Sequence, residues 1–514
     1  MMKNRITKKK LFIINEQFLS NRYKVMKKGP VFNDIKKNFT SRDSLGIEGA
    51  TASIQGELCP VVNTVTPRAF YWIFMVWNYY DFHLNYNGKK DNYDDFDKPF
   101  LKKNDYYFVL SNLMNPDSDQ VNLVGKDKTS QDMNDNPQGP YPYNKDYFVT
   151  RFCGMQYYNA GCLTLGFITD TNQDGTVSYK LPRLTEELGK PMAQAFERVI
   201  KDTDYYKNYR LKNTLVPRSA LEEFGKIVSL DLKHFDECKR LLKDALFTPK
   251  SNRNWTNENL ILSKDYLIML YKKYGVTEVN TSSMRNILFD YFSPRGDQKE
   301  YDNGLQEIIV NWETVIGRQY FTIALELVWK YMLEQLLTKP MGLDEWISDC
   351  IKNAKWSIPI SKNLNSIISE CNYSFEKREE MIAQGARSSN RTDNNIETSI
   401  RILLSLYNRF KDREDIKSNY LEYGEEVSIQ SLIELVDSFG DKPIIEFIAY
   451  IMKNWIVYKH EATAFEKMLY GRDGYFIENV DGVYVYQKEM YPDFQGIRLI
   501  QLMQVMKDLD MFED

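Results

Sequence analysis

The stretch DTNQDGTV, residues 170–177, has the residue types and spacing of the first half of a calcium-binding loop. Asp170, Asn172 and Asp174 stand at alternate positions, and Gly175 follows them. A calcium loop needs a bidentate carboxylate at its twelfth position, and counting from Asp170 that position is Leu181. The stretch therefore predicts an Asp-Gly turn between two strands and no metal site.

Other residues that could carry chemistry are few or scattered. The chain has three histidines and six cysteines, and no two cysteines form a CxxC pair. Zinc or iron sites are therefore not expected, and the widely spaced cysteines are typical of reduced core thiols. The sequence lacks a GxxxxGKS/T phosphate loop, a GxSxG nucleophile turn and a GxGxxG dinucleotide loop, so no cofactor is expected.

Two polar residues beside strongly apolar segments are candidates for function. Arg68 lies in the first turn of a helix predicted to be capped by Thr66, where a cation opposes the helix dipole. Its expected partner is a carboxylate or, in a functional role, a phosphate or another ligand. His460 is expected in the turn after the apolar segment 443–459, either as a hydrogen-bonded structural imidazole or as a functional residue.

The amino-terminal region is basic. Residues 1–40 carry eleven Lys or Arg and two acidic residues, a difference of +9. Lys8, Lys9 and Lys10 form its densest cluster and are candidate contacts for nucleic-acid phosphates. The alternative is an ordinary solvated segment.

The composition is that of a large folded protein. The chain has 514 residues, of which 43% are hydrophobic, and its net charge is −4. It is therefore long enough for several cores and is not basic overall. The longest apolar run, residues 69–77, is far shorter than the roughly 20 residues of a membrane-spanning helix. A soluble, cytoplasmic protein is expected.

Helical patterns dominate, so the predicted fold class is mainly α, a multi-domain helical protein. Apolar residues recur with the helical period over 305–331, and Pro340 is expected to end this helix. Helices are also predicted at 66–82, where Pro67 suits the first helical position, and at 443–459 and 497–512.

Two hairpins interrupt this helical pattern. Over 145–200 the order helix, strand, Asp-Gly turn, strand, helix is that of a winged-helix module, which makes Lys180 and Arg183 candidate DNA contacts beside the wing. Six basic residues balance six acidic ones over this range, so the charge favours packing of the wing against a protein at least as much as DNA binding. A second turn, Asp481-Gly482, predicts a C-terminal β-hairpin followed by a helix.

These patterns predict four domains: a basic head with an N-terminal helical region, a winged-helix-like module with a long polar loop, a helical domain, and a C-terminal helical domain with the hairpin. The predicted ranges are 1–98, 99–203, 204–375 and 376–514. Polar composition predicts a loop at 115–146 and a hinge or surface loop at 376–398.

Several stretches together resemble a known group of proteins. They are DSLGIEGATASIQGELCPVVNTVTPRAFYWIFMVW, YYNAGCLTLGFITD with LTEELGKPMAQAFE, WETVIGRQYFTIALELVW and HEATAFEKMLYGRDGYFIENVDG. The group consists of uncharacterised bacterial proteins of similar length, often encoded in restriction and phage-defence islands. The resemblance covers most of the chain and implies an accessory component of an antiviral system, but it supplies no catalytic residue.

The leading predicted function is a non-catalytic accessory component of a bacterial antiviral defence system. It would bind a partner protein from the same operon, an ATPase or a nuclease, with DNA as a further candidate ligand. The alternatives are a metal-dependent nuclease effector with a dispersed active site and a winged-helix DNA-binding regulator. A clustered carboxylate–lysine site would favour the nuclease, and a basic face would favour the regulator.

Overall fold

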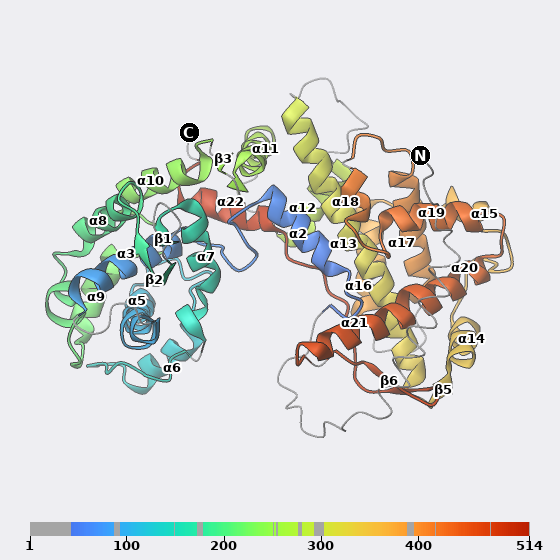
Figure 1. Cartoon of the computed structure of the whole chain (residues 1–514), viewed down its shortest axis with the longest axis horizontal. Coiled ribbons are helices and arrows are strands. Elements are labelled where there is room, and N and C mark those ends of the chain that lie inside the picture. Colours follow the sequence, from blue (N-terminus) through green and yellow to red (C-terminus); the bar gives the residue numbers. More distant parts are fainter. Residues whose placement is uncertain are drawn as a thin grey trace.

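The computed structural model describes residues 43–512, except 87–92, 149, 172–177, 250, 253–254, 276–279, 292–302, 388–394, 417 and 473. Over these residues the chain is mainly helical and forms two lobes joined by a central group of helices (Figure 1). The N lobe is built on α3 (Phe70–Asn85) and α5 (Lys102–Met114), and the C lobe on α13 (Asn303–Leu336).

The remaining elements divide among the two lobes and the centre. The N lobe also contains α4 (Tyr93–Phe96), η1 (Asp97–Leu101), α6 (Lys126–Asp135), η2 (Arg151–Gly154), α7 (Gln156–Leu165), β1 (Ile168–Thr171), β2 (Ser178–Leu184), α8 (Gly189–Ile200), η3 (Tyr205–Tyr209), α9 (Arg218–Ile227) and α10 (Asp236–Phe247). The centre contains α2 (Glu48–Leu58), β3 (Ser251–Asn252), β4 (Trp255–Thr256), α11 (Glu258–Tyr274) and α22 (Arg498–Asp508).

The C lobe surrounds α13 with shorter helices and one small sheet. Its further elements are α12 (Thr281–Asn286), η4 (Ile287–Tyr291), β5 (Met341–Gly342), α14 (Leu343–Asn353), α15 (Asn365–Ile368), α16 (Phe375–Arg387), α17 (Asn395–Phe410), α18 (Ser418–Glu422), α19 (Ile429–Phe439), α20 (Ile444–Tyr450), η5 (Ile451–Val457), α21 (Tyr458–Leu469), β6 (Ile477–Val480) and β7 (Val483–Tyr486).

Helix α3 forms the core of the N lobe because its sequence is apolar on nearly every side. Its Phe70 stacks on Phe108 of α5, with ring centroids 4.3 Å apart. The helix begins at Phe70 and not, as predicted, at Pro67, and the hydroxyl of the predicted cap Thr66 bonds to the backbone of Asn63. The helix starts later because its first amide donors are bound by tertiary partners, which are described below.

Helix α13 confirms the prediction of a long helix from the apolar period over 305–331, and it ends at Leu336, before Pro340. It is buried along most of its length because α2, α11 and α17 pack against different sides of it. Its polar residues Glu313, Arg318 and Glu326 are therefore buried with its apolar ones. A buried charge needs a partner, so these residues fix where charged groups from other helices must lie.

The strands form small antiparallel sheets. β1 pairs with β2, with Thr169 opposite Arg183, and the predicted turn Asp174-Gly175 lies outside the described residues. β6 pairs with β7 across Asp481-Gly482, where both residues have positive φ, and β5 pairs with the other side of β7. Positive φ at both central residues is the conformation that an Asp-Gly hairpin turn adopts most easily.

Two segments predicted as loops contain helices. The predicted loop 115–146 contains α6, and the predicted hinge 376–398 contains α16. Neither helix shows a strong apolar pattern. α16 forms because Arg378 and Glu379 find oppositely charged partners on other helices, which a local sequence pattern does not reveal.

The predicted domain boundaries remain predictions. The boundary 203/204 falls between α8 and η3, and 375/376 falls at the first residue of α16. The last helix, α22, lies in the centre against α11 and reaches the N lobe (Figure 1). None of the described helices has the length and apolar content needed to cross a bilayer.

Candidate functional site

Arg68 lies just before α3, fully buried, and its guanidinium meets two carboxylates. Its Nε donates to Asp508 Oδ2 at 3.0 Å and its Nη1 donates to Asp119 Oδ2 at 2.7 Å. Asp508 Oδ2 also accepts from the backbone N–H of Ala69 at 2.9 Å. A carboxylate from α22 therefore stands at the N-terminal end of α3, where the helix dipole favours negative charge. Of the two kinds of partner expected for Arg68, the structure places carboxylates at bonding distance.

His460 is fully buried in the first turn of α21, which continues η5 without a break, so its predicted position in a turn is wrong. Its Nδ1 lies 2.9 Å from the carbonyl oxygen of Ser44, and its Nε2 accepts from the backbone N–H of Phe476 at 3.2 Å. The proton therefore sits on Nδ1. Burial lowers the pKa of His460 to about 4. The imidazole joins the start of the described chain to the hairpin.

The candidate DNA contacts fall in separate places. Lys180 and Arg183 are exposed on β2 in the N lobe. Lys8, Lys9 and Lys10 lie outside the described residues. Strand β2 lies in the N lobe, whereas α21, the helix that carries His460, lies in the C lobe (Figure 1).

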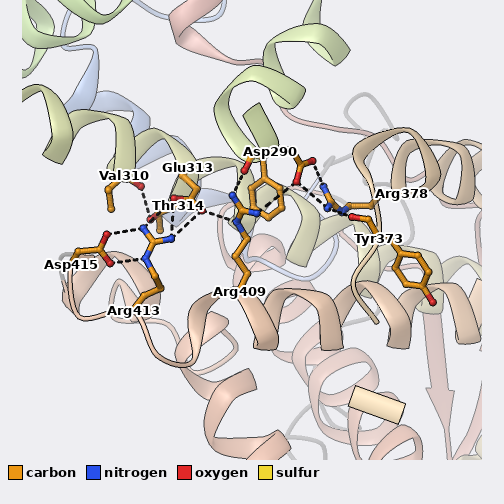
Figure 2. Close-up of polar contacts among 10 residues, drawn as sticks. Asp290, Val310, Glu313, Thr314, Tyr373, Arg378, Arg409, Arg413 and Asp415 are labelled. Atoms are coloured by element: carbon orange, nitrogen blue, oxygen red, sulfur yellow. Dashed lines mark hydrogen bonds and ion pairs between the residues drawn. The ribbon is translucent and has the colours of Figure 1, made fainter. Parts of the chain in front are cut away.

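The densest polar cluster of the C lobe was not predicted. It begins at Glu313 of α13, which is buried and faces the end of α17 (Figure 2). Arg409 Nε donates to Glu313 Oε1 at 2.6 Å, and both terminal nitrogens of Arg413 lie 3.1–3.2 Å from the Glu313 carboxylate. Arg413 also donates to both oxygens of Asp415, at 2.6 and 2.8 Å.

Asp290 of η4 extends the cluster to α16 (Figure 2). Its Oδ2 accepts from Arg378 Nη1 at 3.0 Å, and its Oδ1 lies 3.6 Å from Arg409 Nη1. Both guanidinium groups also lie over the ring of Phe289. The ring centroid is 4.8 Å from Cζ of Arg378 and 4.1 Å from Cζ of Arg409. Each arginine is therefore held by a carboxylate and by an aromatic face.

A third carboxylate, Glu379, follows Arg378 on α16. Arg285 of α12 donates to both of its oxygens, at 3.0 and 2.7 Å, and the hydroxyl of Tyr320 donates to Oε1 at 2.8 Å. Arg285 also stacks over Phe494 at 3.8 Å. These forked contacts use the planar geometry that distinguishes arginine from lysine.

The arginine network balances its own charge. We use this name for four arginines and four carboxylates: Arg285, Arg378, Arg409, Arg413, Asp290, Glu313, Glu379 and Asp415. Guanidinium groups stay protonated at neutral pH and cannot act as bases, so the network supplies fixed charge and geometry and no proton transfer. Its chemical capability is to hold α12, η4, α13, α16 and α17 in one arrangement.

The cysteines and carboxylates offer no evident reactive centre. All six cysteines are buried, and burial raises the pKa of each thiol, which disfavours the reactive thiolate. Among the residues that the structure describes, no three His, Cys, Asp or Glu side chains form a group that could hold a metal ion.

The chain was compared with known protein families, curated proteins and solved structures. No protein-family model, no curated protein and no solved structure matches it.

Proposed function

We propose that the chain is a cytoplasmic, non-catalytic accessory component of a bacterial antiviral defence system. It binds a partner protein encoded in the same operon, an ATPase or a nuclease. The loose resemblance of most of the chain to defence-island proteins supports the context. The arginine network supports a non-catalytic role for the C lobe, because its charged groups are used to hold helices together.

The observation that carries the binding role is the open edge of the C-terminal hairpin. In the described part of the chain the sheet order is β5–β7–β6, so β6 has a strand neighbour on one side only. Val480 and Val483 face each other across the hairpin and are 48% and 41% exposed, whereas Tyr484 points into the lobe. Val480 lies on the edge strand β6 and Val483 on the central strand β7, and an edge strand with an exposed apolar side chain favours strand addition by a partner protein.

Co-purification tests this proposal. The tagged full chain is expressed with the products of the adjacent genes, as wild type and as Val480→Lys. Lysine on the edge strand β6 opposes strand pairing, so we expect this variant to lose the partner. Val121→Lys, at a more exposed valine of the N lobe, is the matched control and should retain it. Equal recovery with all three proteins would contradict binding at the hairpin.

DNA binding at the winged-helix-like segment is a second candidate. The order α7, β1, β2, α8 and the exposed Lys180 and Arg183 favour it. A gel-shift assay at two salt concentrations would compare the wild-type chain with K180Q/R183Q and with K8Q/K9Q/K10Q. Phosphate contacts make affinity fall steeply with salt, so the variant that flattens this slope identifies the basic residues that contact the phosphates. Unchanged slopes in both variants would exclude both groups.

The metal-dependent nuclease gains no supporting observation from the described residues. No three His, Cys, Asp or Glu side chains there form a cluster that could hold a metal ion. Its test is incubation of the purified chain with DNA and RNA in the presence of Mg²⁺ or Mn²⁺. Cleavage that follows the elution peak of the protein and vanishes on one carboxylate substitution would overturn the accessory role.

A further inference from the structure

One side of α13 gathers buried acceptor oxygens without donors. Glu326 is 3% exposed, and among the described residues its Oε2 has no hydrogen-bond partner. Gln319 lies two helical turns earlier on the same face, and its side chain bonds to the backbone of Gln495. The Oε1 atoms of both glutamines are also buried without a hydrogen-bond partner among the described residues. Buried acceptors are normally satisfied, so three of them in one region favour a ligand that donates hydrogen bonds.

The donor groups of the two glutamines are already used. Gln319 Nε2 donates to the carbonyl oxygen of Gln495 at 3.2 Å. Gln495 Nε2 donates to the carbonyl oxygen and to Oε2 of Glu48, at 2.9 Å each. The two amide oxygens therefore remain for a ligand as acceptors, and Glu326 Oε2 is a further acceptor when its carboxyl group is ionised.

The electrostatic surroundings of Glu326 are acidic. Burial raises the pKa of Glu326 well above its ordinary value, and the charges of Glu48 and Asp43 raise it further. Of the nearby cations, Lys467 donates to the backbone carbonyl of Asp43 and not to a carboxylate. Arg318, one residue before Gln319, is paired with Glu425 at 2.5 Å. A ligand for this region is therefore expected to be positive as well as a donor.

A side-chain cation suits this site better than a metal ion. No three of the acidic side chains in the described part of the chain are close enough together to hold a metal. An ammonium or guanidinium group carries both the positive charge and several N–H donors, so it can bind amide and carboxylate oxygens together.

We propose that this acceptor site binds the basic N-terminal tail of the same chain, residues 1–42, through one or more of Lys36, Lys37 and Arg42. The tail carries twelve Lys or Arg and two acidic residues, a difference of +10. The acceptor site is defined by Glu326, Gln319, Gln495 and Glu48. The charge of the tail is complementary to that of the site.

The point where the tail joins the described chain supports this assignment. Asp43, the first described residue, acts on Glu326 electrostatically. The next residues are fixed along α21, where the carbonyl oxygens of Ser44 and Leu45 bond to His460 and Thr463. Lys36 is seven residues before Asp43, a chain length that spans up to roughly 25 Å. A chain of this length from Asp43 is long enough for one of the three cations to reach the site.

A double-mutant cycle in the full chain tests the proposal. The tail variant K36Q/K37Q/R42Q, the site variant Glu326→Gln and their combination are compared by thermal unfolding at pH 7.5. Loss of the tail cations leaves Glu326 without its partner, so the tail variant should lower the Tm by several degrees. In the Glu326→Gln background the same three substitutions should lower it by less than half as much, because no buried acid remains to be neutralised.

The control is K8Q/K9Q/K10Q, which removes the same charge from the far end of the tail. It should shift the Tm equally in both backgrounds. An equal effect of K36Q/K37Q/R42Q in the two backgrounds would overturn the proposal and leave Glu326 as a protonated acid without a tail partner.

A second measurement does not depend on how stable the variants are. The exposed Asp493, whose backbone bonds to Glu326, and the half-buried Glu48 are the more accessible acids around the site. Zero-length carbodiimide cross-linking of the wild-type chain, followed by mass spectrometry, should join Lys36 or Lys37 to one of them. The yield should fall at least severalfold in Glu326→Gln and should be unchanged in Glu187→Gln, an exposed acid of the N lobe. Cross-links from these lysines only to other regions would overturn the assignment.

Discussion

The two lobes place buried negative charge in different surroundings. In the N lobe, Asp105 is fully buried, and the hydroxyl of Tyr147 donates to it at 2.9 Å. In the C lobe, Glu313 is equally buried, but the guanidinium groups of Arg409 and Arg413 donate to it. The first carboxyl group is surrounded by neutral donors and the second by two cations.

This difference has consequences for protonation in the N lobe. Burial raises the pKa of Asp105 to about 7, and hydrogen bonds from Tyr147 and Cys153 oppose this only in part. Burial also raises the pKa of Asp81 to about 6, although Arg210 Nη2 lies 3.2 Å away. A buried carboxyl group can thus keep its proton or can acquire cations. A carboxyl group that keeps its proton makes stability depend on pH. A carboxylate paired with cations makes stability depend on the presence of both the carboxylate and the cations.

Glu326 is the contrasting case inside the C lobe. It lies on the same helix as Glu313, yet burial raises its pKa well above the ordinary value. No arginine of the described residues bonds to it. The contrast between these two glutamates on α13 is the reason for assigning the tail cations to Glu326.

The largest expected effect is that of Glu313→Ala. It leaves Arg409 and Arg413 partly buried without their shared carboxylate, so the free energy of unfolding should fall by about 3–5 kcal/mol. Urea unfolding measures this. Asp415, the outer carboxylate bound to Arg413, is 38% exposed. Asp415→Ala should therefore lower the free energy of unfolding by less than about 1 kcal/mol. Equal losses would mean that burial does not set the strength of the arginine network.

Asp105→Asn should change the pH dependence of stability. The pKa of Asp105 is higher in the folded chain, about 7, than in the unfolded chain, about 4, so the folded state binds the extra proton between these values. Wild-type stability from this group is therefore lost as pH rises, by about 2–3 kcal/mol between pH 5 and pH 8.

The asparagine variant should lack this loss when urea unfolding is repeated at both pH values. Asp146→Asn, at an exposed N-lobe aspartate, is the control and should behave as wild type. A wild-type pH dependence in Asp105→Asn would show that Asp105 does not keep its proton near neutral pH.

His460→Gln should show the opposite sign. The pKa of His460 is about 4 in the folded chain, below the value of about 6.5 in the unfolded chain, so the unfolded state binds the proton first. Stability is therefore lost as pH falls below about 6.5, by about 2 kcal/mol at pH 5. Glutamine can still donate to Ser44 and accept from Phe476. Its unfolding free energy should fall less than that of wild type between pH 7 and pH 5, and an equal fall would contradict the buried neutral imidazole.

The smallest expected effect is that of Glu186→Ala in the N lobe. Glu186 forms an i,i+4 ion pair with Lys190, but both side chains are largely exposed. Water and salt screen such a pair, so the variant should unfold at the wild-type urea concentration. A loss comparable to that of Glu313→Ala would mean that pairing alone, without burial, decides the contribution of an ion pair.

The sequence was sufficient where the signal is local. The helical period over 305–331 predicted α13, and the apolar run after Thr66 predicted a buried helix, although α3 begins only at Phe70. The start was misplaced because the groups that bind the first amides come from Tyr158 and Asp508, and Asp508 is 439 residues away from Ala69. No local pattern contains that information.

The arginine network could not be predicted for the same reason. Arg409 and Glu313 are 96 residues apart, and Arg378 lies in a polar segment that was interpreted as a hinge. The available signals were weak. Glu313 interrupts a strongly apolar pattern, and Arg409 with Arg413 repeats at the helical spacing near the end of α17. Such signals indicate that partners exist but not which residues they are.

The most direct test of the contrast between the lobes is an infrared titration of the full chain between pH 5 and pH 9, in wild type and in Asp105→Asn. The wild-type spectrum should contain a protonated-carboxyl band that disappears with a midpoint near pH 7, and this component should be missing from the variant. Identical titrations in the two proteins would show that Asp105 is already ionised in its buried site, which would contradict the proposed difference between the N lobe and the C lobe.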